Sequence, residues 1–139
     1  MIVRNKLKWL PIPFQGYKAI NLFGVIVIRG DTKMKEVDMN HEIIHTKQFT
    51  EIGLVSLILS LSLVFNGLWW LWLLIGLFGF YIVYVLEWLI RTIIYKFDTK
   101  KAYKNMSFER EAYTNQRDME YLKTRKRFSW VKYIRDGRN

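Results

Sequence analysis

The sequence predicts a membrane α-helical protein: a two-helix transmembrane hairpin with a small N-terminal β-sheet and a C-terminal amphipathic helix. Two observations lead to this fold class. An uncharged stretch of 35 residues runs from Ile52 to Leu86 in the middle of the chain, which is too long and too apolar for a helix of a soluble core. Basic residues flank it, so the chain combines a formal net charge of +10 with 51% hydrophobic residues. At 139 residues, we expect one membrane-embedded domain, 1–139.

The distribution of charge predicts the orientation in the membrane. Residues 1–35 and 96–139 are rich in lysine and arginine. Between them the only basic residues are Lys47 and Arg91. Because basic flanks favour the cytoplasmic side, we expect an integral membrane protein with both termini in the cytoplasm and an even number of crossings. We expect the lipid bilayer, and no nucleic acid, as the partner of this basic surface. Cysteine is absent, which excludes disulfides and thiolate catalysis.

The N-terminal segment, residues 1–32, contains both prolines and is typical of short strands. Segments 7–12 and 16–22 are followed by a β-branched run, which lies between two glycines. We expect a small antiparallel sheet in which strand 24–29 is an exposed edge. The alternative is an irregular arm on the membrane surface, held by three aromatic side chains: Trp9, Phe14 and Phe23.

Two long helices are expected next. Residues 33–65 should form one helix that continues into the first membrane arm, and residues 68–97 should form the second membrane helix. The turn signal Asn66-Gly67 separates them. At about 1.5 Å per residue, the second arm covers roughly 28 Å of hydrocarbon but the first only about 21 Å. At the end of the second helix, Glu87 and Arg91 are spaced i, i+4 and are expected to pair and to anchor the helix at the interface.

The C-terminal region is more polar. Residues 107–124 are expected to form an amphipathic helix with Ser107 as its N-cap. Its apolar face is made by Phe108, Ala112, Met119 and Leu122. We expect a basic loop at 100–105 before this helix. After it comes a basic, aromatic tail, 125–139, suited to an anionic membrane surface.

The residues His41-Glu42-Ile43-Ile44-His45 form an H-E-x-x-H pattern on the first long helix. This spacing places two imidazoles one turn apart on one face, which suits a single metal ion. We expect His41 and His45 to bind one Zn²⁺ per chain. Glu42 would act as general base, taking a proton from water and returning it to the leaving amine. The chain has no other histidine, so a third protein ligand must be a carboxylate or a weaker donor. The alternative is two surface histidines on an amphipathic helix.

Two carboxylates, Glu109 and Glu111, are the candidates for the third ligand. Both lie in the first turn of the helix after Ser107, where the helix dipole favours acids with or without a metal. On the helical wheel Glu111 lies somewhat closer to the apolar face. Periodicity therefore mildly favours Glu111.

The pattern H-E-I-I-H-T-K-Q, followed at a distance by S-F-E-R-E-A-Y, resembles the gluzincin class of zinc metallopeptidases. In layout it is most similar to the membrane-embedded branch that contains the prenyl-protein endopeptidases and the heat-shock membrane proteases. That class carries a glutamate ligand in an E-x-x-x-D pattern on a second helix. The resemblance implies a zincin-like site completed by the C-terminal helix, with Glu109 as third ligand and Glu111 as second choice. Tyr113 stands where the class has an aspartate beside a histidine ligand.

The resemblance also implies a function. A membrane-bound zinc metalloendopeptidase would hydrolyse peptide bonds at the cytoplasmic face of the membrane. Its peptide or protein substrate would pair along strand 24–29, and Asn40 and Tyr113 are candidate helpers at the oxyanion. The alternative is a non-catalytic membrane protein or adaptor with a structural metal site, which the tyrosine at position 113 and the small size favour.

Overall fold

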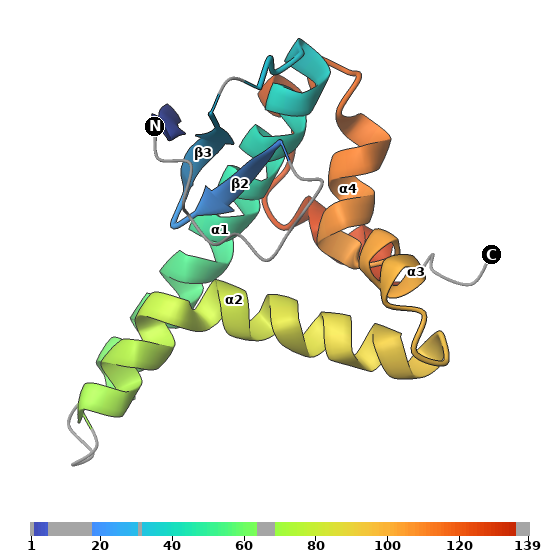
Figure 1. Ribbon diagram of the computed structural model, residues 1–139. Helices are drawn as coiled ribbons and strands as arrows, with labels where there is room; N and C mark the ends of the chain where they lie inside the picture. Colours follow the sequence, from blue (N-terminus) through green and yellow to red (C-terminus); the bar gives the residue numbers. More distant parts are fainter. Residues whose placement is uncertain (1, 6–17, 31, 64–68, 136–139) are drawn as a thin grey trace.

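The structure is a computed structural model that describes residues 2–5, 18–30, 32–63 and 69–135. Within these residues the protein is mostly helical with a small sheet (Figure 1). The expected strand at 7–12, the arm residues Trp9 and Phe14, and the turn Asn66-Gly67 lie outside the described residues. In chain order the elements are β1 (Ile2–Asn5), β2 (Ala19–Leu22), β3 (Val25–Arg29), α1 (Glu36–Leu63), α2 (Trp69–Ile94), α3 (Thr99–Lys104), α4 (Ser107–Asn115), α5 (Tyr121–Thr124) and the 3-10 helix η1 (Ser129–Ile134).

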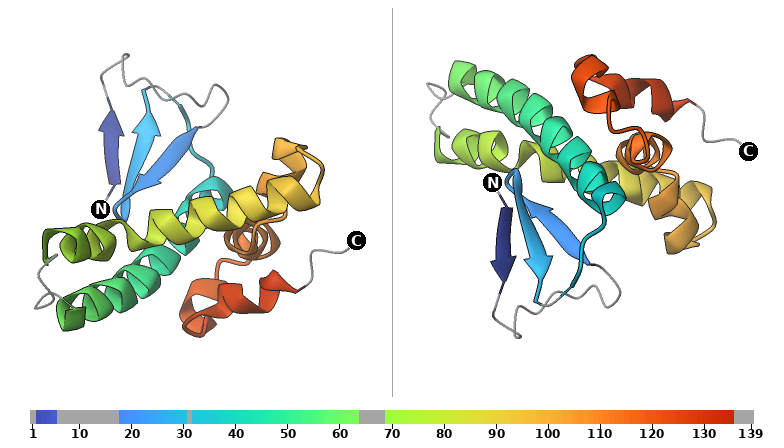
Figure 2. Two further views of the ribbon diagram at one scale, coloured as in Figure 1. Left: turned by 90° about the horizontal axis from the view of Figure 1, so that it is seen from below. Right: turned by 90° about the horizontal axis from the view of Figure 1, so that it is seen from above.

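Helix α1 is the central element of the fold. The two further views in Figure 2 show the sheet on one side of the first half of α1, with α4 and the C-terminal segment on the other side. On the sheet side, Ala19, Ile26 and Ile28 are buried and pack against Met39 and Ile43 of α1. Helix α1 therefore carries the sheet on one face and α4 on another, and the expected metal ligands lie on the α4 side, between α1 and α4.

The sheet has the strand order β1-β3-β2. Strand β3 pairs in parallel with β1 and antiparallel with β2. The short connection between β2 and β3 contains Phe23 and Gly24, both with positive φ, as tight hairpin turns require. The expectation that strand 24–29 is an exposed edge is wrong, because Ile2–Asn5 covers its second side. The sheet is consequently mixed rather than antiparallel.

Helices α1 and α2 form an antiparallel pair with little space between their backbones. Gly79 faces Ser56 and Gly76 faces Ser60 so closely that a Cβ atom on either glycine would overlap the serine side chain. Small residues of this kind allow two helices to approach closely. A helical hairpin is therefore present, and Figure 1 shows α2 diverging from α1 beyond this contact and running below α3 and α4.

One helix among the described residues is long and apolar enough to cross a membrane. It is the segment Trp70–Ile94 of α2, with a mean hydropathy of 2.1. The expected two-helix transmembrane hairpin is not supported. The first half of α1 carries charged residues and the H-E-x-x-H pattern, and its apolar part, 52–63, covers only about 18 Å at about 1.5 Å per residue.

The C-terminal region differs from its expected form in length and in capping. The expected loop at 100–105 is mostly the short helix α3, whose first turn is capped by the carboxylate of Asp98. Helix α4 ends at Asn115 instead of reaching residue 124. The side-chain amide of Asn40 on α1 donates hydrogen bonds to carbonyl oxygens of residues 115, 116 and 118, which gives partners to carbonyl groups at and just beyond the end of the helix. Met119, expected on its apolar face, is exposed.

Glu87 and Arg91 pair as expected, at 2.8 Å. Glu87 has a second role, because its carboxylate accepts hydrogen bonds from the backbone N–H of Ser107 and from the hydroxyl of Ser107. Ser107 was expected to be the N-cap of α4. The N-cap is Met106 instead, whose side chain makes no capping hydrogen bond, and Ser107 is the first residue of the helix. A carboxylate at the positive end of a helix stabilises it. Helix α2 thus fixes the start of α4.

The core lies where α1, α2, α3 and α4 meet. Four apolar residues form its buried centre: Ile52, Phe80, Met106 and Phe108. The ring of Phe108 stacks with Tyr84 and packs against Trp130. The position of Phe108 on α4 is therefore fixed by both α2 and the C-terminal segment, and its neighbour in sequence, Glu109, is carried with it.

Candidate metal centre

Three side chains converge between α1 and α4. The Nε2 atoms of His41 and His45 are 3.1 Å apart. An oxygen of Glu109 lies 3.6 Å from His41 Nε2, and the other lies 3.3 Å from His45 Nε2. These three residues can hold a metal ion. The first-choice ligand set, with Glu109 rather than Glu111, is the set that the structure brings together.

The separations fit a tetrahedral ion. Zinc binds nitrogen and oxygen ligands at about 2.0–2.1 Å, so two ligand atoms of a tetrahedral site are about 3.3 Å apart. The two histidine nitrogens are 3.1 Å apart, and each lies 3.3–3.6 Å from one oxygen of the Glu109 carboxylate, His45 from Oε1 and His41 from Oε2. Two imidazoles and one carboxylate leave a fourth position for water or substrate, as in zinc hydrolases. The donor set and its geometry therefore suit a catalytic type of site.

The centre is removed from solvent. Glu109 is 1% exposed and His45 is 8% exposed. Among the described residues, no hydrogen-bond partner lies at Glu109 Oε2 or at His41 Nδ1. A buried polar atom without a partner carries a desolvation cost. A cation placed between the three side chains would satisfy the carboxylate oxygen.

The pKa values of His45 and Glu109 likewise indicate that positive charge is favoured at this centre. Burial disfavours the charged form of His45, but the charge and hydrogen bond of Glu109, together with Glu42 and Gln48, outweigh burial and raise the pKa of His45 to about 9. Burial likewise opposes ionisation of Glu109, yet the charges and hydrogen bonds of His45 and His41 hold its pKa well below the usual range. Both pKa shifts favour positive charge beside Glu109, and a metal ion that binds His45 would require its nitrogen ligand atom to carry no proton.

No protein-family model, curated protein or solved structure matches this chain.

Glu42 lies within the same electrostatic environment. Burial raises its pKa, while the nearby charges of His45 and His41 oppose the rise. Its backbone carbonyl accepts a hydrogen bond from Asn21 of β2 at 3.2 Å, and Asn21 also donates to Thr46 at 2.6 Å. Strand β2 thus lies alongside the turn of α1 that carries the motif.

Glu111 does not take part in the ligand set. Its carboxylate accepts hydrogen bonds from Gln48, Tyr121 and Arg125. The sequence periodicity that favoured Glu111 detected its burial correctly, since Glu111 is 0% exposed. Periodicity reports only which face is buried, and α4 has buried side chains on more than one face.

The two expected helpers have different environments. The ring of Tyr113 packs edge-on against the ring of His41, with centroids 4.7 Å apart, so Tyr113 lies beside a ligand as expected. The side-chain amide of Asn40 donates to carbonyl oxygens at the end of α4. This geometry gives Asn40 the role of joining α1 to α4 rather than that of an oxyanion donor.

Two residues of the centre escaped the sequence analysis. The hydroxyl of Tyr84 donates to Glu109 Oε1 at 2.8 Å, and Oε1 of Gln48 lies 2.7 Å from Nδ1 of His45. A signal existed for Gln48, because a residue three positions after His45 shares its helix face. None existed for Tyr84, since no spacing in the sequence connects α2 with α4.

Proposed function

We propose that this protein is a membrane-bound, zinc-dependent metallopeptidase that hydrolyses peptide bonds at the cytoplasmic face of the membrane. The observation that carries the proposal is the convergence of His41, His45 and Glu109 at separations suited to one tetrahedral ion. Imidazole nitrogens favour zinc over magnesium or calcium, which prefer oxygen ligands alone.

The chain supplies the remaining chemistry through Glu42. Zinc at the centre would activate a water molecule and polarise a peptide carbonyl. Glu42 belongs to the same helical turn as both histidines, and its pKa is raised by burial. A carboxylate with a raised pKa is better matched to proton transfer near neutral pH. In the proposed reaction Glu42 accepts a proton from water and delivers it to the nitrogen of the leaving amine.

The proposed substrate is a peptide or protein segment in extended form. Strand 24–29 has no free edge for it, because β3 is paired on both sides. Strand β2 is an outer strand of the described sheet, and Asn21 in β2 contacts the motif helix directly. We therefore place a peptide along β2, where backbone hydrogen bonds would hold it beside the centre.

The proposed location is the membrane, with both termini and the metal centre in the cytoplasm. Because a single crossing by α2 would separate the termini, this orientation requires that α1 and α2 both enter the bilayer and return to the same side. Support comes from the apolar helix Trp70–Ile94 and from the basic segments at both ends of the chain, which favour the cytoplasmic side. Many large apolar side chains of 54–61 and of α2 are exposed. Burial of these side chains in lipid would remove this surface from water.

The test is the substitution Glu42→Gln in purified protein loaded with zinc. We expect the wild type to cleave members of a quenched-fluorescence peptide library, and the variant to lose turnover by at least about a hundredfold while it keeps one zinc per chain. Lys47→Gln, an exposed change on the same helix, is the matched control and should leave turnover unchanged. Equal turnover in Glu42→Gln and wild type would contradict the proposal.

A structural metal site without catalysis is the second candidate function. The burial of the ligands favours it, since His45 and Glu109 are nearly inaccessible and structural sites are closed. In this case the wild type would bind zinc but cleave no peptide, and Glu42→Gln would change no measured property. The same experiment therefore separates the two functions.

A further inference from the structure

Gln48 is a fully buried amide, one turn after His45 on α1. Its Nε2 atom donates to the carbonyl oxygen of Phe108 at 3.1 Å and to Oε2 of Glu111 at 2.9 Å. Its Oε1 atom lies 2.7 Å from Nδ1 of His45. All the polar groups in these contacts lie on α1 or α4, so Gln48 bridges the two helices that supply the ligands.

The partners of Gln48 determine which way its amide points. A carbonyl oxygen and a carboxylate oxygen can only accept, so the end of the amide that faces them must be the NH₂ group. The amide oxygen then faces His45 and can only accept a hydrogen bond. Nδ1 of His45 must therefore carry the hydrogen. With a metal bound, this arrangement leaves Nε2 of His45 as the ligand atom, directed toward Glu109 and His41.

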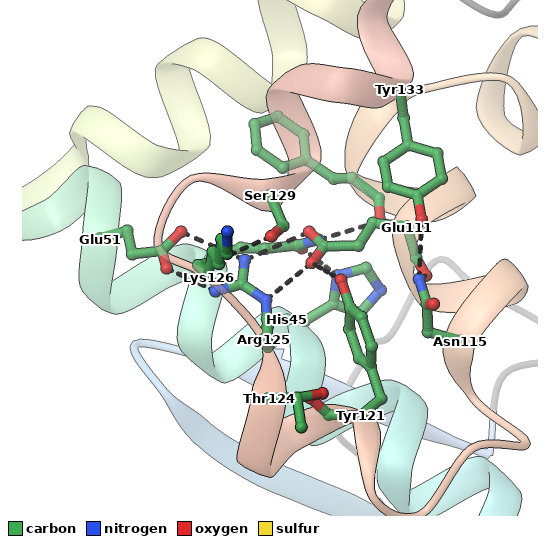
Figure 3. A network of polar contacts seen from close by, with 12 residues as sticks. His45, Glu51, Glu111, Asn115, Tyr121, Thr124, Arg125, Lys126, Ser129 and Tyr133 are labelled. Atoms are coloured by element: carbon green, nitrogen blue, oxygen red, sulfur yellow. Dashed lines mark hydrogen bonds and ion pairs between the residues drawn. The ribbon is translucent and has the colours of Figure 1, made fainter.

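Glu111 is held in turn by a buried ionic cluster, shown in Figure 3. Arg125 donates from Nε to Glu111 Oε1 at 2.7 Å and from Nη2 to Oε2 at 3.2 Å. The same guanidinium also pairs with both carboxylate oxygens of Glu51 on α1. The side chain of Arg125 is only 4% exposed. A planar guanidinium can bind two carboxylates in this fork geometry, whereas the ammonium of lysine cannot.

The hydroxyl of Tyr121 completes the environment of Glu111, to which it donates at 2.7 Å. Burial and the bond to Glu111 raise the pKa of Tyr121, so the phenol keeps its proton. The cluster thus contains two carboxylates, one guanidinium and one neutral donor. These contacts hold the carboxylate of Glu111 in one orientation, in which its Oε2 accepts the hydrogen bond from Gln48.

We propose that Gln48 is a positioning residue of the metal centre, which fixes the ring orientation and the tautomer of His45. Glu111, Arg125 and Glu51 hold Gln48 in place. The C-terminal segment therefore completes the centre, although Arg125 acts on His45 only through Glu111 and Gln48. This inference rests on the proposed metal centre and deepens it, because it assigns to Gln48 the support of His45, whereas Tyr113 packs against the other histidine, His41.

The first experiment measures zinc affinity by competition with a chelator in detergent-solubilised full-length protein. Gln48→Met removes the acceptor for His45 Nδ1 and keeps a side chain of similar length. Loss of the hydrogen-bond partner of a metal-binding histidine typically weakens metal affinity by about 10–100-fold, and this is the expected effect. The matched control is Lys47→Met, an exposed neighbour on the same helix, which should bind zinc as the wild type does.

The second experiment tests the link to the C-terminal segment without touching α1. Arg125→Lys keeps the charge but loses the fork that holds Glu111 and Glu51. We expect a reduction in zinc affinity of about threefold to tenfold, smaller than for Gln48→Met because Gln48 itself remains. Arg127→Lys, exposed in the same segment, is the control and should show no reduction.

A third measurement needs no variant. In long-range nitrogen–proton NMR spectra of the zinc-loaded wild type, the Nδ1–H of His45 should be visible and protected from exchange with water. If Gln48→Met does not fold, the inference is tested by this resonance and by the zinc affinity of Arg125→Lys. The inference is overturned if the resonance is absent, or if folded Gln48→Met binds zinc as tightly as Lys47→Met. Failure of the wild type itself to bind zinc would instead overturn the proposed function.

Discussion

Glu109 and Glu111 lie two positions apart on one short helix and have opposite surroundings. Glu109 faces two imidazoles and the hydroxyl of Tyr84, whereas Glu111 faces a guanidinium, a phenol and an amide. Both are almost fully buried, so the partner and not the burial distinguishes them. A buried carboxylate without a compensating partner would be costly. Glu111 has permanent partners within the chain, while Glu109 depends on a proton or a metal ion at the histidines.

This difference predicts different effects of the same substitution. Glu109→Gln should abolish stoichiometric zinc binding, because the third ligand loses its charge. Glu111→Gln should still bind one zinc per chain at saturating metal, but its unfolding free energy should fall by about 1–3 kcal/mol, because Arg125 loses a charged acceptor. Metal analysis and thermal unfolding of both variants check this. If Glu111→Gln loses zinc while Glu109→Gln retains it, then Glu111 and not Glu109 is the third ligand, which would contradict the ligand set.

At the scale of the elements, local patterns predicted α1 and α2 well, and contacts between distant residues decided the rest. The apolar run and the motif spacing are local features, so their helices were predicted within a few residues. Strand β3 became central because Ile2–Asn5 pairs with it, and the start of α4 depends on Glu87 of α2. No periodicity within either segment contains this information. His41 and His45 could be predicted because their spacing is local. The hydrogen bond from Tyr84 to Glu109 could not, because it joins α2 to α4.

The close contact of α1 and α2 gives a prediction at this scale. Gly79→Ala should destabilise the protein by about 1–3 kcal/mol, because the added Cβ would overlap Ser56 and force the helices apart. Gly53→Ala is the matched control, since a Cβ there meets open space. It should be neutral or stabilising by up to about 1 kcal/mol, as expected for alanine in a helix. Thermal unfolding in detergent measures both, and equal melting temperatures for Gly79→Ala and the wild type would contradict this packing.

The whole molecule divides into two parts. A polar part holds the centre, and an apolar part is formed by the second half of α1 and the first half of α2, which pack against each other. The sheet and α4 enclose the first half of α1 (Figure 2), and the second half of α1 has exposed apolar side chains such as Ile58, at 59%. Its apolar length is shorter than a hydrocarbon core of about 30 Å. We therefore expect the α1–α2 pair to enter the bilayer from one side while the centre stays at the surface.

Membrane retention tests this arrangement. A lysine near the centre of a membrane helix costs roughly 2.5–3.5 kcal/mol, so Ile58→Lys should reduce the fraction of protein that stays with carbonate-washed membranes. Met119→Lys replaces an apolar side chain, 42% exposed, in the C-terminal region and should leave this fraction unchanged. If Ile58→Lys is retained as fully as Met119→Lys, the end of α1 does not lie in lipid.

The measurement that tests the central claim most directly is the metal content of native protein purified at neutral pH. The account predicts about one zinc per chain in the wild type and almost none in His45→Ala, because two ligands cannot replace the convergent set of three. Wild-type protein without bound metal that also takes up none from added zinc would contradict it, as would a His45→Ala variant that retains its full zinc content.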